Sequence, residues 1–499
     1  MVAKPTILIT ALPDFDRRYK YHKQMRGGIG SRSLRKRNQR SAPRNIHPIL
    51  DVLCGAAVLR EAGFDVCVDD DQYRDSIDYA GYERALRARL SGDPDIVFVR
   101  LSQPSLVTDF SVSKKLRALW PAAIFHAFGP LFSAQELINC AAETRIYDTL
   151  IASEFESVVL RVAGGERFEE IPGIYVRSDD GYDCTDPKRA LADMQSLPFA
   201  AYDLVDYRKL DRFIVQTERG CPLACNYCPY YLGQGHKFRA KTPERVVEEL
   251  CHYFNIYGIQ RFLIHDPIFS LDRKRVVAIC EGLIDAALPI EWECETHMDH
   301  LDAELLRLLY QAGNRHLAFG VESASDDVLN KANRRFNKWD TVKENVRLCK
   351  ELGIRVTGYF ILALPGETLR SAFQTMRLAR ELDLDVSRFN LPSSYPGTGA
   401  FDLAVQSQLL QPEDFRGTNV EYYTQLVTEG VSARAKGHRI SYSDAISDRQ
   451  ALLLWYIARH RFVARGNTIS RFLSRLKVGI YLAIVGASAA FKLRRMVIS

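Results

Sequence analysis

The sequence lacks several features that would each assign it to a broad class. Its net charge is only +6 over 499 residues, so charge gives no reason to expect nucleic-acid binding. No secretory hydrophobic region precedes the strand-like TILITAL that begins at Thr6, and we therefore expect a cytoplasmic protein. It also contains no long internal repeat and no low-complexity tract. With 47% hydrophobic and 26% charged residues, the composition is that of a globular chain long enough for two or three domains.

The first part of the chain alternates short apolar runs with helical stretches. Residues 49–62 are one such helix, which ends at Gly63. Strands that alternate with helices predict a doubly wound parallel sheet, here over residues 1–170. Residues 171–207 are rich in turn signals and predict a connecting segment. The predicted strands of the first domain are 6–12, 64–68, 95–99, 123–128 and 148–151.

A second region, residues 208–410, repeats strand and helix about six times. Thr242 followed by Pro243 predicts the start of its first helix. Serine and threonine are favoured at the N-cap position, and proline is favoured in the first helical turn. Six such units predict a partial (β/α)6 barrel with functional residues at the strand C-termini. Residues 411–499 look mostly helical. The predicted strands are 213–217, 261–265, 291–295, 316–321, 356–362 and 386–390.

Three cysteines follow the first strand of this second region. Cys221, Cys225 and Cys228 lie within eight residues, so their thiolates can converge on one metal centre. A [4Fe-4S] cluster usually takes four cysteines, and three leave one iron open for another ligand. A structural zinc site needs four ligands, but the sequence has no second Cys-x-x-Cys, and His236 has no obvious companion. A dithiol redox pair would leave the third cysteine without a role.

These cysteines head an ordered series of motifs that resembles the radical S-adenosylmethionine (radical SAM) superfamily. The series is RGCPLACNYC, KFRAKTPERVVEEL, FLIHDPIF, FGVESASDDVLNKANR, YFILALPGET and YPGT. The resemblance implies a [4Fe-4S] cluster whose open iron binds S-adenosyl-L-methionine. One-electron reduction would then release methionine and a 5′-deoxyadenosyl radical. It also implies an external electron donor such as a flavodoxin or ferredoxin.

The resemblance also assigns cofactor-binding positions. Tyr227 would lie near the adenine, and four residues at strand ends would contact the other polar groups of the cofactor: Asp266, Glu295, Glu322 and Ser323. A strand-end carboxylate can instead bond a helix N-terminus, and that alternative stays open. The chain departs from the family at Pro267, where relatives often have a second aspartate, and at Ala363, where they often have glycine.

A doubly wound domain ahead of a radical SAM barrel resembles the cobalamin-binding branch. The stretches AAVLREAGFDV and AFGPLFSAQE support it, as do Ser153-Glu-Phe-Glu156, where relatives often show Gly-Glu-Gly-Glu, and the LPFAAYDLVDY linker. The Asp-x-His-x-x-Gly signature of an axial ligand is absent, and His47 and His126 lie outside that context. A Rossmann-like domain used for packing or substrate binding is the alternative. Methylthiotransferases share this layout, but Cys54 and Cys67 are poorly placed for their second cluster.

Two further segments suggest surface contacts. Residues 17–44 contain eleven Lys or Arg and no acidic residue, which predicts either a solvated loop or an electrostatic contact with a phosphorylated substrate or anionic membrane. Residues 478–491 are apolar and flanked by basic residues, but fourteen fall short of the roughly 20 needed to cross a bilayer. We expect a helix that lies on a membrane through residues 471–495, or one that is buried against a domain.

We therefore expect a radical SAM enzyme that modifies an unactivated carbon of a small molecule, with cobalamin-dependent C-methylation favoured. Radical cyclisation, rearrangement or other oxidoreductase chemistry without cobalamin is one alternative, and a non-catalytic metal-cluster scaffold is another. Membrane contact would favour a lipid-like or pigment-like substrate, as in relatives that act on hopanoids and tetrapyrroles. We expect no nucleic-acid partner.

Overall fold

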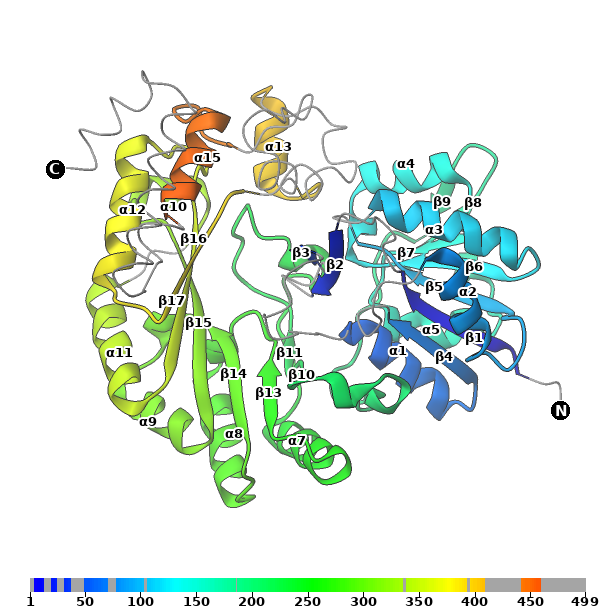
Figure 1. Ribbon diagram of the computed structural model, residues 1–499, viewed down its shortest axis with the longest axis horizontal. Coiled ribbons are helices and arrows are strands. Elements are labelled where there is room, and N and C mark those ends of the chain that lie inside the picture. The colour runs from blue at the N-terminus through cyan, green and yellow to red at the C-terminus, as the bar shows by residue number, and fades with distance from the viewer. Residues whose placement is uncertain are drawn as a thin grey trace. The chain divides into compact units, whose positions relative to one another are not determined.

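The computed structural model describes residues 4–12, 19–24, 31–36, 49–70, 78–102, 106–184, 186–334, 338–392, 395–408 and 441–458. Their elements form two compact units (Figure 1). Of the described residues, the first unit contains those up to 221 together with 229–241, and the second contains 222–228 and those from 242 onward.

The first unit is built on a seven-stranded sheet with the order β4-β1-β5-β6-β7-β8-β9. The first five strands in this order are parallel, whereas β8 and β9 pair antiparallel, so the predicted doubly wound sheet is confirmed. The strand order reverses between β1 and β5, which is where ligands bind in sheets of this kind. The strands are β1 (Thr6–Ala11), β4 (Asp65–Asp70), β5 (Ile96–Arg100), β6 (Ile124–Phe128), β7 (Thr149–Ile151), β8 (Ile174–Arg177) and β9 (Tyr182–Cys184).

Helices cover both faces of this sheet. Figure 1 shows α1 on one face and α3 and α4 on the other. Helix α1 packs closely on α5 because Gly55 has no side chain, and the ring of Phe155 occupies the place of a Cβ atom. The helices are α1 (Leu50–Glu61), α2 (Tyr79–Arg87), α3 (Leu106–Leu119), α4 (Gln135–Thr144) and α5 (Phe155–Ala163).

Two stretches form strands that the sequence analysis did not assign. Strands β8 and β9 arise within the predicted connecting segment, where they extend the edge of the first sheet beyond β7. Within the basic stretch 17–44, β2 (Tyr19–Gln24) and β3 (Ser31–Lys36) pair antiparallel, and the rest of that stretch lies outside the described residues.

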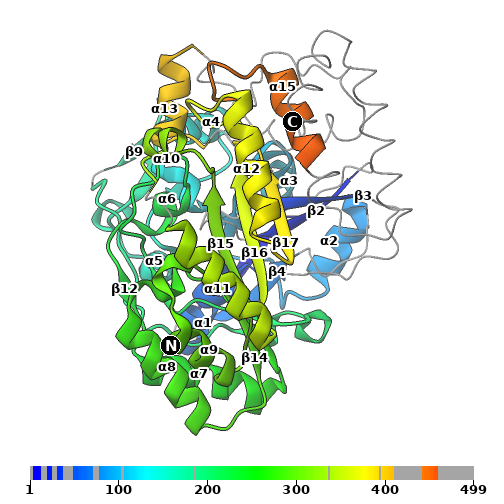
Figure 2. The same cartoon turned by 90° about the vertical axis from the view of Figure 1, so that its left-hand side faces the viewer.

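The second unit contains five parallel strands whose spatial order follows the chain, β13-β14-β15-β16-β17. The helices that connect these strands run along one side of them (Figures 1 and 2). All six predicted strands are confirmed, the first of them as β10 (Phe213–Val215). The strands are β13 (Arg261–Ile264), β14 (Glu291–Thr296), β15 (Asn314–Glu322), β16 (Arg355–Ile361) and β17 (Val386–Asn390), and the helices are α7 (Pro243–Tyr257), α8 (Arg273–Asp285), α9 (Ala303–Gln311), α11 (Trp339–Leu352) and α12 (Leu369–Glu381).

Helix α7 begins as predicted. The Thr242 hydroxyl accepts a hydrogen bond from the Arg245 N–H at 3.3 Å, and Pro243 stands at the first helical position. Beyond α13 (Gly399–Gln406), the described residues include α15 (Asp448–Ile457), while the basic and apolar stretch 471–495 lies outside them.

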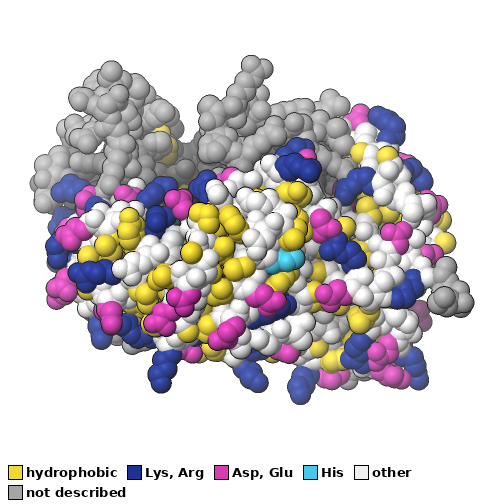
Figure 3. Space-filling model, turned by 90° about the horizontal axis from the view of Figure 1, so that it is seen from below, with side chains coloured by type: hydrophobic (Ala, Val, Ile, Leu, Met, Phe, Trp, Pro, Cys, Tyr) yellow, Lys and Arg dark blue, Asp and Glu magenta, His cyan; other side chains and the backbone are white. Residues whose placement is uncertain are grey.

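Within the part of the chain that the structure describes, no helix combines the length and apolar character required to cross a membrane. Figure 3 shows dark blue basic and magenta acidic side chains interspersed over one face, in keeping with the small net charge.

Candidate functional site

The cysteine loop follows two short strands, β10 and β11 (Glu218–Arg219). Cys225 is buried, and Cys221 and Cys228 are partly exposed. None of the eleven cysteines forms a disulfide, and all eleven lie in described residues. Three thiols on one loop therefore provide the donor set that a [4Fe-4S] cluster with one open iron requires, so these residues fit the cluster.

Asn226, in the middle of this loop, fixes the loop to two helix ends. Its N–H donates to the Ala332 carbonyl at 3.0 Å, and its Nδ2 donates to the Lys331 carbonyl at 2.7 Å, both at the end of α10 (Asp326–Lys331). Its own carbonyl accepts from the N–H of Ala400 in α13 at 2.9 Å. The Asn333 amide adds a bond to the Ala224 carbonyl at 2.7 Å. The path of the loop is thus set by main-chain groups on both sides.

Glu322 lies at the end of β15 in an unusual backbone conformation. Its φ is +61°, in the left-handed region, and the register with β16 shifts between Gly320 and Glu322. Such bulges re-aim side chains and are frequent beside active sites. Gly320 makes the arrangement possible, because a Cβ atom there would collide with the Glu322 carboxylate.

The Glu322 carboxyl is close to three other ionisable groups. Burial raises its pKa to about 7, although nearby Arg334 and a hydrogen bond from Tyr227 lower the pKa, and Glu295 adds to the increase. Burial and the Glu322 carboxylate also raise the pKa of Tyr227 well above its ordinary value. The structure therefore brings together three predicted residues, Tyr227, Glu295 and Glu322. Neutral tyrosine beside a carboxyl that titrates near pH 7 can both donate and accept hydrogen bonds at a polar cofactor.

Arg334 is a site residue that the sequence analysis missed. It is buried, and its Nη2 donates to the Gly320 carbonyl at 3.0 Å. Burial alone would lower the pKa of its guanidinium, but Tyr227 and Glu322 outweigh that effect and raise the pKa. A buried, permanently charged guanidinium suits the carboxylate of a ligand. In the sequence Arg334 ends the same motif that contains Glu322, but only the fold places the two side chains together.

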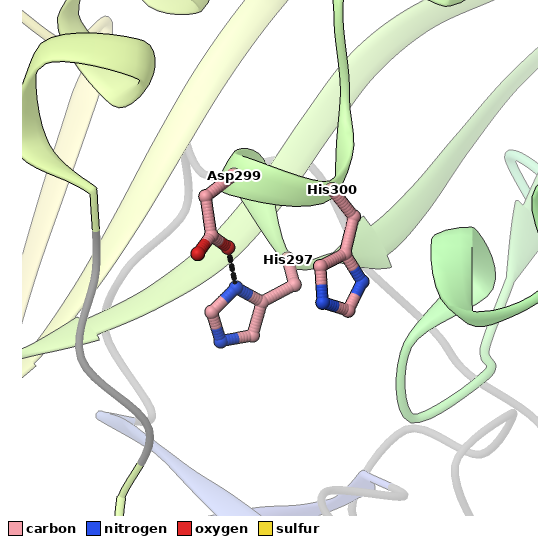
Figure 4. Close-up of side chains that lie close together, drawn as sticks. All are labelled: His297, Asp299 and His300. Carbon is pink, nitrogen blue, oxygen red and sulfur yellow. Dashed lines mark hydrogen bonds and ion pairs between the residues drawn. The ribbon is translucent and has the colours of Figure 1, made fainter.

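A cluster of two histidines and an aspartate follows β14 (Figure 4). The ligand atoms of His297, Asp299 and His300 all lie within 4.8 Å of one another. His297 Nδ1 bonds the Asp299 carboxylate, and its other nitrogen bonds a guanidinium N–H of Arg334. Both ring nitrogens of His297 are therefore occupied, and the carboxylate–histidine pair orients the arginine. The run HMDH shows this cluster in the sequence, but the sequence analysis did not single it out.

The other predicted residues lie at neighbouring strand ends. Glu295, near the end of β14, accepts a 3.5 Å bond from the Tyr359 hydroxyl. Asp266 is fully buried just after β13, two strands from Glu322 in the sheet order. The Ser323 hydroxyl accepts from the Ser325 N–H at 3.2 Å and lies 3.3 Å from that of Thr375, so it helps to form the turn before α10.

The departure at Ala363 has a structural cost. Ala363 follows β16 with a φ of +68°, where glycine is favoured, because the conformation crowds a Cβ atom. Its N–H bonds the carboxylate of Glu367, and its carbonyl accepts from the Tyr442 N–H at 2.9 Å. Glu367 is fully buried, and burial raises its pKa to about 8, although the hydrogen bond from the Ala363 N–H lowers the pKa.

In the first unit, His126 is part of the hydrophobic core. His126 lies within β6 with no exposure, its Nδ1 is 2.7 Å from the Thr149 hydroxyl, and its ring stacks on Phe98. Burial lowers its pKa to about 4, so it is a neutral core residue. His47 lies outside the described residues. A small polar cavity lies beyond β6 and β7, lined in part by Gly129, Ser153 and Gln234.

Comparison with known proteins gives a family match and several relatives. The radical SAM superfamily matches residues 215–379. An "uncharacterized methyltransferase PH0819" of Pyrococcus horikoshii is 26% identical over 333 residues, which is 65% of this chain and 72% of that protein. The anaerobic magnesium-protoporphyrin IX monomethyl ester cyclase of Cereibacter sphaeroides is 25% identical over 371 residues, 70% of this chain but only 58% of the cyclase.

Among solved structures, the fold is similar to that of a radical S-adenosylmethionine methyltransferase, TsrM, from Kitasatospora setae. The TM-score is 0.64 with 19% sequence identity, and the match covers 81% of this chain and 78% of the other. That structure contains cobalamin and a [4Fe-4S] cluster. At this identity the similarity shows a shared fold.

Proposed function

We propose that this chain, whose residues 215–379 match the radical SAM superfamily, is a radical SAM enzyme that transfers a methyl group to an unactivated carbon of a small molecule with the help of cobalamin. The observation that carries the proposal is the fixed cysteine loop beside the buried group of Tyr227, Glu322 and Arg334. The methyltransferase among the relatives supports methylation as the outcome.

We assign the [4Fe-4S] cluster to Cys221, Cys225 and Cys228. When bound, the cluster and S-adenosyl-L-methionine supply a 5′-deoxyadenosyl radical. Arg334, held by His297 and Asp299, is positioned to bind a carboxylate of the cofactor. Its charge is permanent, so this contact would not vary over the physiological pH range.

The remaining predicted residues surround the same strand ends. Tyr227 provides an aromatic face for the adenine, and Glu295 and Glu322 can accept hydrogen bonds from hydroxyl or amino groups. Because the pKa of Glu322 is about 7, a ligand amine would shift this carboxyl toward its charged form. Asp266 and Ser323 complete the proposed set at the ends of β13 and β15.

We further propose that residues 1–170 bind cobalamin and residues 208–410 the cluster and S-adenosyl-L-methionine, with 171–207 connecting them and 411–499 forming a helical region. Support for cobalamin comes from the doubly wound sheet and from the cobalamin-bound TsrM structure of similar fold. Because His126 is buried in the core, we expect that His126 does not ligate cobalamin. A flavodoxin or ferredoxin would supply electrons, and the substrate would be lipid-like or pigment-like.

The test is anaerobic reconstitution of the full chain with iron, sulfide and cobalamin. We expect about four irons per chain and a bound-cobalamin visible spectrum. With a reductant and a suitable substrate, we expect S-adenosylhomocysteine together with 5′-deoxyadenosine and methionine. Cys225→Ala should lose the cluster and all three products. Zinc in place of iron would contradict the proposal and favour a non-catalytic scaffold.

A second candidate is radical cyclisation or rearrangement without cobalamin, favoured by the similarity to the cyclase. The two functions separate in the same experiment. Production of 5′-deoxyadenosine and methionine at full rate by protein that binds no cobalamin would favour this second candidate.

A further inference from the structure

Two short strands close the cysteine loop at its base. Strand β11 (Glu218–Arg219) pairs antiparallel with β12 (Arg239–Ala240), and Arg219 stands opposite Arg239. The Cys221 N–H donates to the Gly235 carbonyl at 3.2 Å. These strands form the outgoing and returning arms of the loop, so their separation decides where Cys221 lies.

The side chains of both arms are bound by a carboxylate pair at the start of α5. Arg219 donates from Nη1 to Glu154 at 3.1 Å and from Nη2 to Glu156 at 2.7 Å. Arg239 donates to the other oxygen of Glu154 at 2.6 Å. Glu154 thus binds both arms at once, and its Oε2 also accepts from the Ala192 N–H at 2.8 Å.

The network is buried and balanced. The side chains of Glu154, Glu156 and Arg219 are 4%, 1% and 6% exposed, and that of Arg239 is 14% exposed. Two cations face two anions, and the third donor of Arg219, Nε, bonds Gln216 at 2.9 Å. Every branch of that guanidinium therefore has a fixed acceptor. Buried ion pairs of this kind gain little net stability over apolar packing, but their directional bonds specify one geometry.

The ion-pair network is connected to the first cysteine, Cys221, through a very short stretch of main chain. Gly220 is the one residue between Arg219 and Cys221, and its φ of +82° is in the left-handed region. A Cβ atom there would collide with the carbonyl oxygen of Lys237 on the returning arm. A displacement of Arg219 is therefore transmitted directly to Cys221.

We propose that Glu154 and Glu156 are positioning residues that hold the two arms of the cysteine loop through Arg219 and Arg239 and so fix Cys221 for cluster binding. The inference rests on the proposed role of Cys221 as a cluster ligand. It gives the acidic Ser153–Glu156 segment of the doubly wound unit a role in retaining the cluster.

The variants for the test are Glu154→Asp, which keeps the charge but shortens the reach, and the isosteric Glu154→Gln and Glu156→Gln. The matched control is Glu166→Gln, which breaks an exposed pair with Arg161 in the same unit. Each full-length variant is reconstituted anaerobically. Three quantities are then measured: iron per chain, the rate at which a chelator removes iron, and the electron paramagnetic resonance spectrum of the reduced cluster. Circular dichroism gives the folded fraction.

We expect Glu154→Asp and Glu156→Gln to lose iron to the chelator at least tenfold faster per folded chain than wild type, with an altered resonance spectrum. Glu166→Gln should behave as wild type. If Glu154→Gln does not fold, the other two variants decide. Iron loss that only follows the unfolded fraction, or wild-type rates and spectra in both variants, would overturn the inference while the proposed function stands. A wild-type chain that binds no iron would instead refute the proposed function.

Discussion

Glu367 provides a test of the energetics around the second unit's strand ends. Its pKa is about 8 in the folded chain, against 4.5 for the unperturbed group, because the carboxyl is buried. One oxygen accepts the Ala363 N–H, and the other has no hydrogen-bond partner within the described residues. Between the two pKa values the folded chain keeps a proton that the unfolded chain has released. Stability therefore falls as the pH rises from about 4.5 to about 8.

The size of this effect follows from the difference in pKa. The difference between the two pKa values corresponds to about 4 kcal/mol of stability lost by pH 8, where half of the folded chains are still protonated, and to about 3 kcal/mol lost by pH 7. Glu367→Gln keeps an oxygen for the Ala363 N–H but cannot ionise. We expect the variant to match wild type near pH 5 and to become more stable than wild type, by several kcal/mol, as the pH approaches 8.5.

The assay is urea unfolding of the metal-free full chain under reducing conditions at pH 5.5, 7.0 and 8.5. Tryptophan fluorescence reports mainly on the second unit, which contains Trp292, Trp339 and Trp455. The pH-dependent contributions of the other titrating groups cancel when the free energies of unfolding of variant and wild type are subtracted. Glu304→Gln, at a side chain 87% exposed, is the control and should show no pH-dependent difference. A difference for Glu367→Gln that stays constant with pH would refute the assigned protonation.

Three further substitutions test the site geometry. Gly320→Ala should displace the Glu322 carboxylate and weaken S-adenosyl-L-methionine binding at least tenfold, measured by calorimetric titration. The control is Gly92→Ala, where a Cβ atom meets open space and the affinity should not change. Unchanged affinity in Gly320→Ala would argue against a role for the Glu322 carboxylate. Ala363→Gly should raise the free energy of unfolding by about 1 kcal/mol, because glycine tolerates the left-handed backbone. This gain would appear as a melting temperature roughly 2–4 °C higher. A lower melting temperature would count against strain at residue 363. Asn226→Ala should retain a folded chain by circular dichroism but lose iron faster to a chelator, since the side-chain bond from the loop to the end of α10 is removed. Wild-type retention would show that the main-chain bonds suffice.

Periodicity and turn chemistry were enough to predict most of the fold. All strands predicted for the two sheets occur, and α7 begins at the predicted cap. Most of these strands are short apolar runs bounded by turn residues, whereas β14 has a glutamate at every second position. Strands β8 and β9 were not predicted. Their residues show no strong alternation, and they become strands because the edge of β7 is available for pairing. Pairing of that kind depends on the assembled sheet, which local sequence does not describe.

The candidate site, like the fold, could be predicted from the sequence only in part. Spacing along the chain predicts the three cysteines as cluster ligands, and motif order predicts Tyr227 and the strand-end carboxylates as cofactor contacts. Arg334 and Asn226 also lie inside two of these motifs, but motif order did not single them out. Their roles depend on contacts with residues distant in sequence, which only the fold brings together. The bulge that turns Glu322 is likewise invisible to a two-residue period.

The bonds made by Asn226 limit how this enzyme can change over evolution. Its main chain and side chain are held from both sides, by the end of α10 and the start of α13. An inserted or deleted residue between Cys225 and Cys228 would move it out of register with both partners at once. Two helices that bind no metal themselves therefore select for a fixed cysteine spacing.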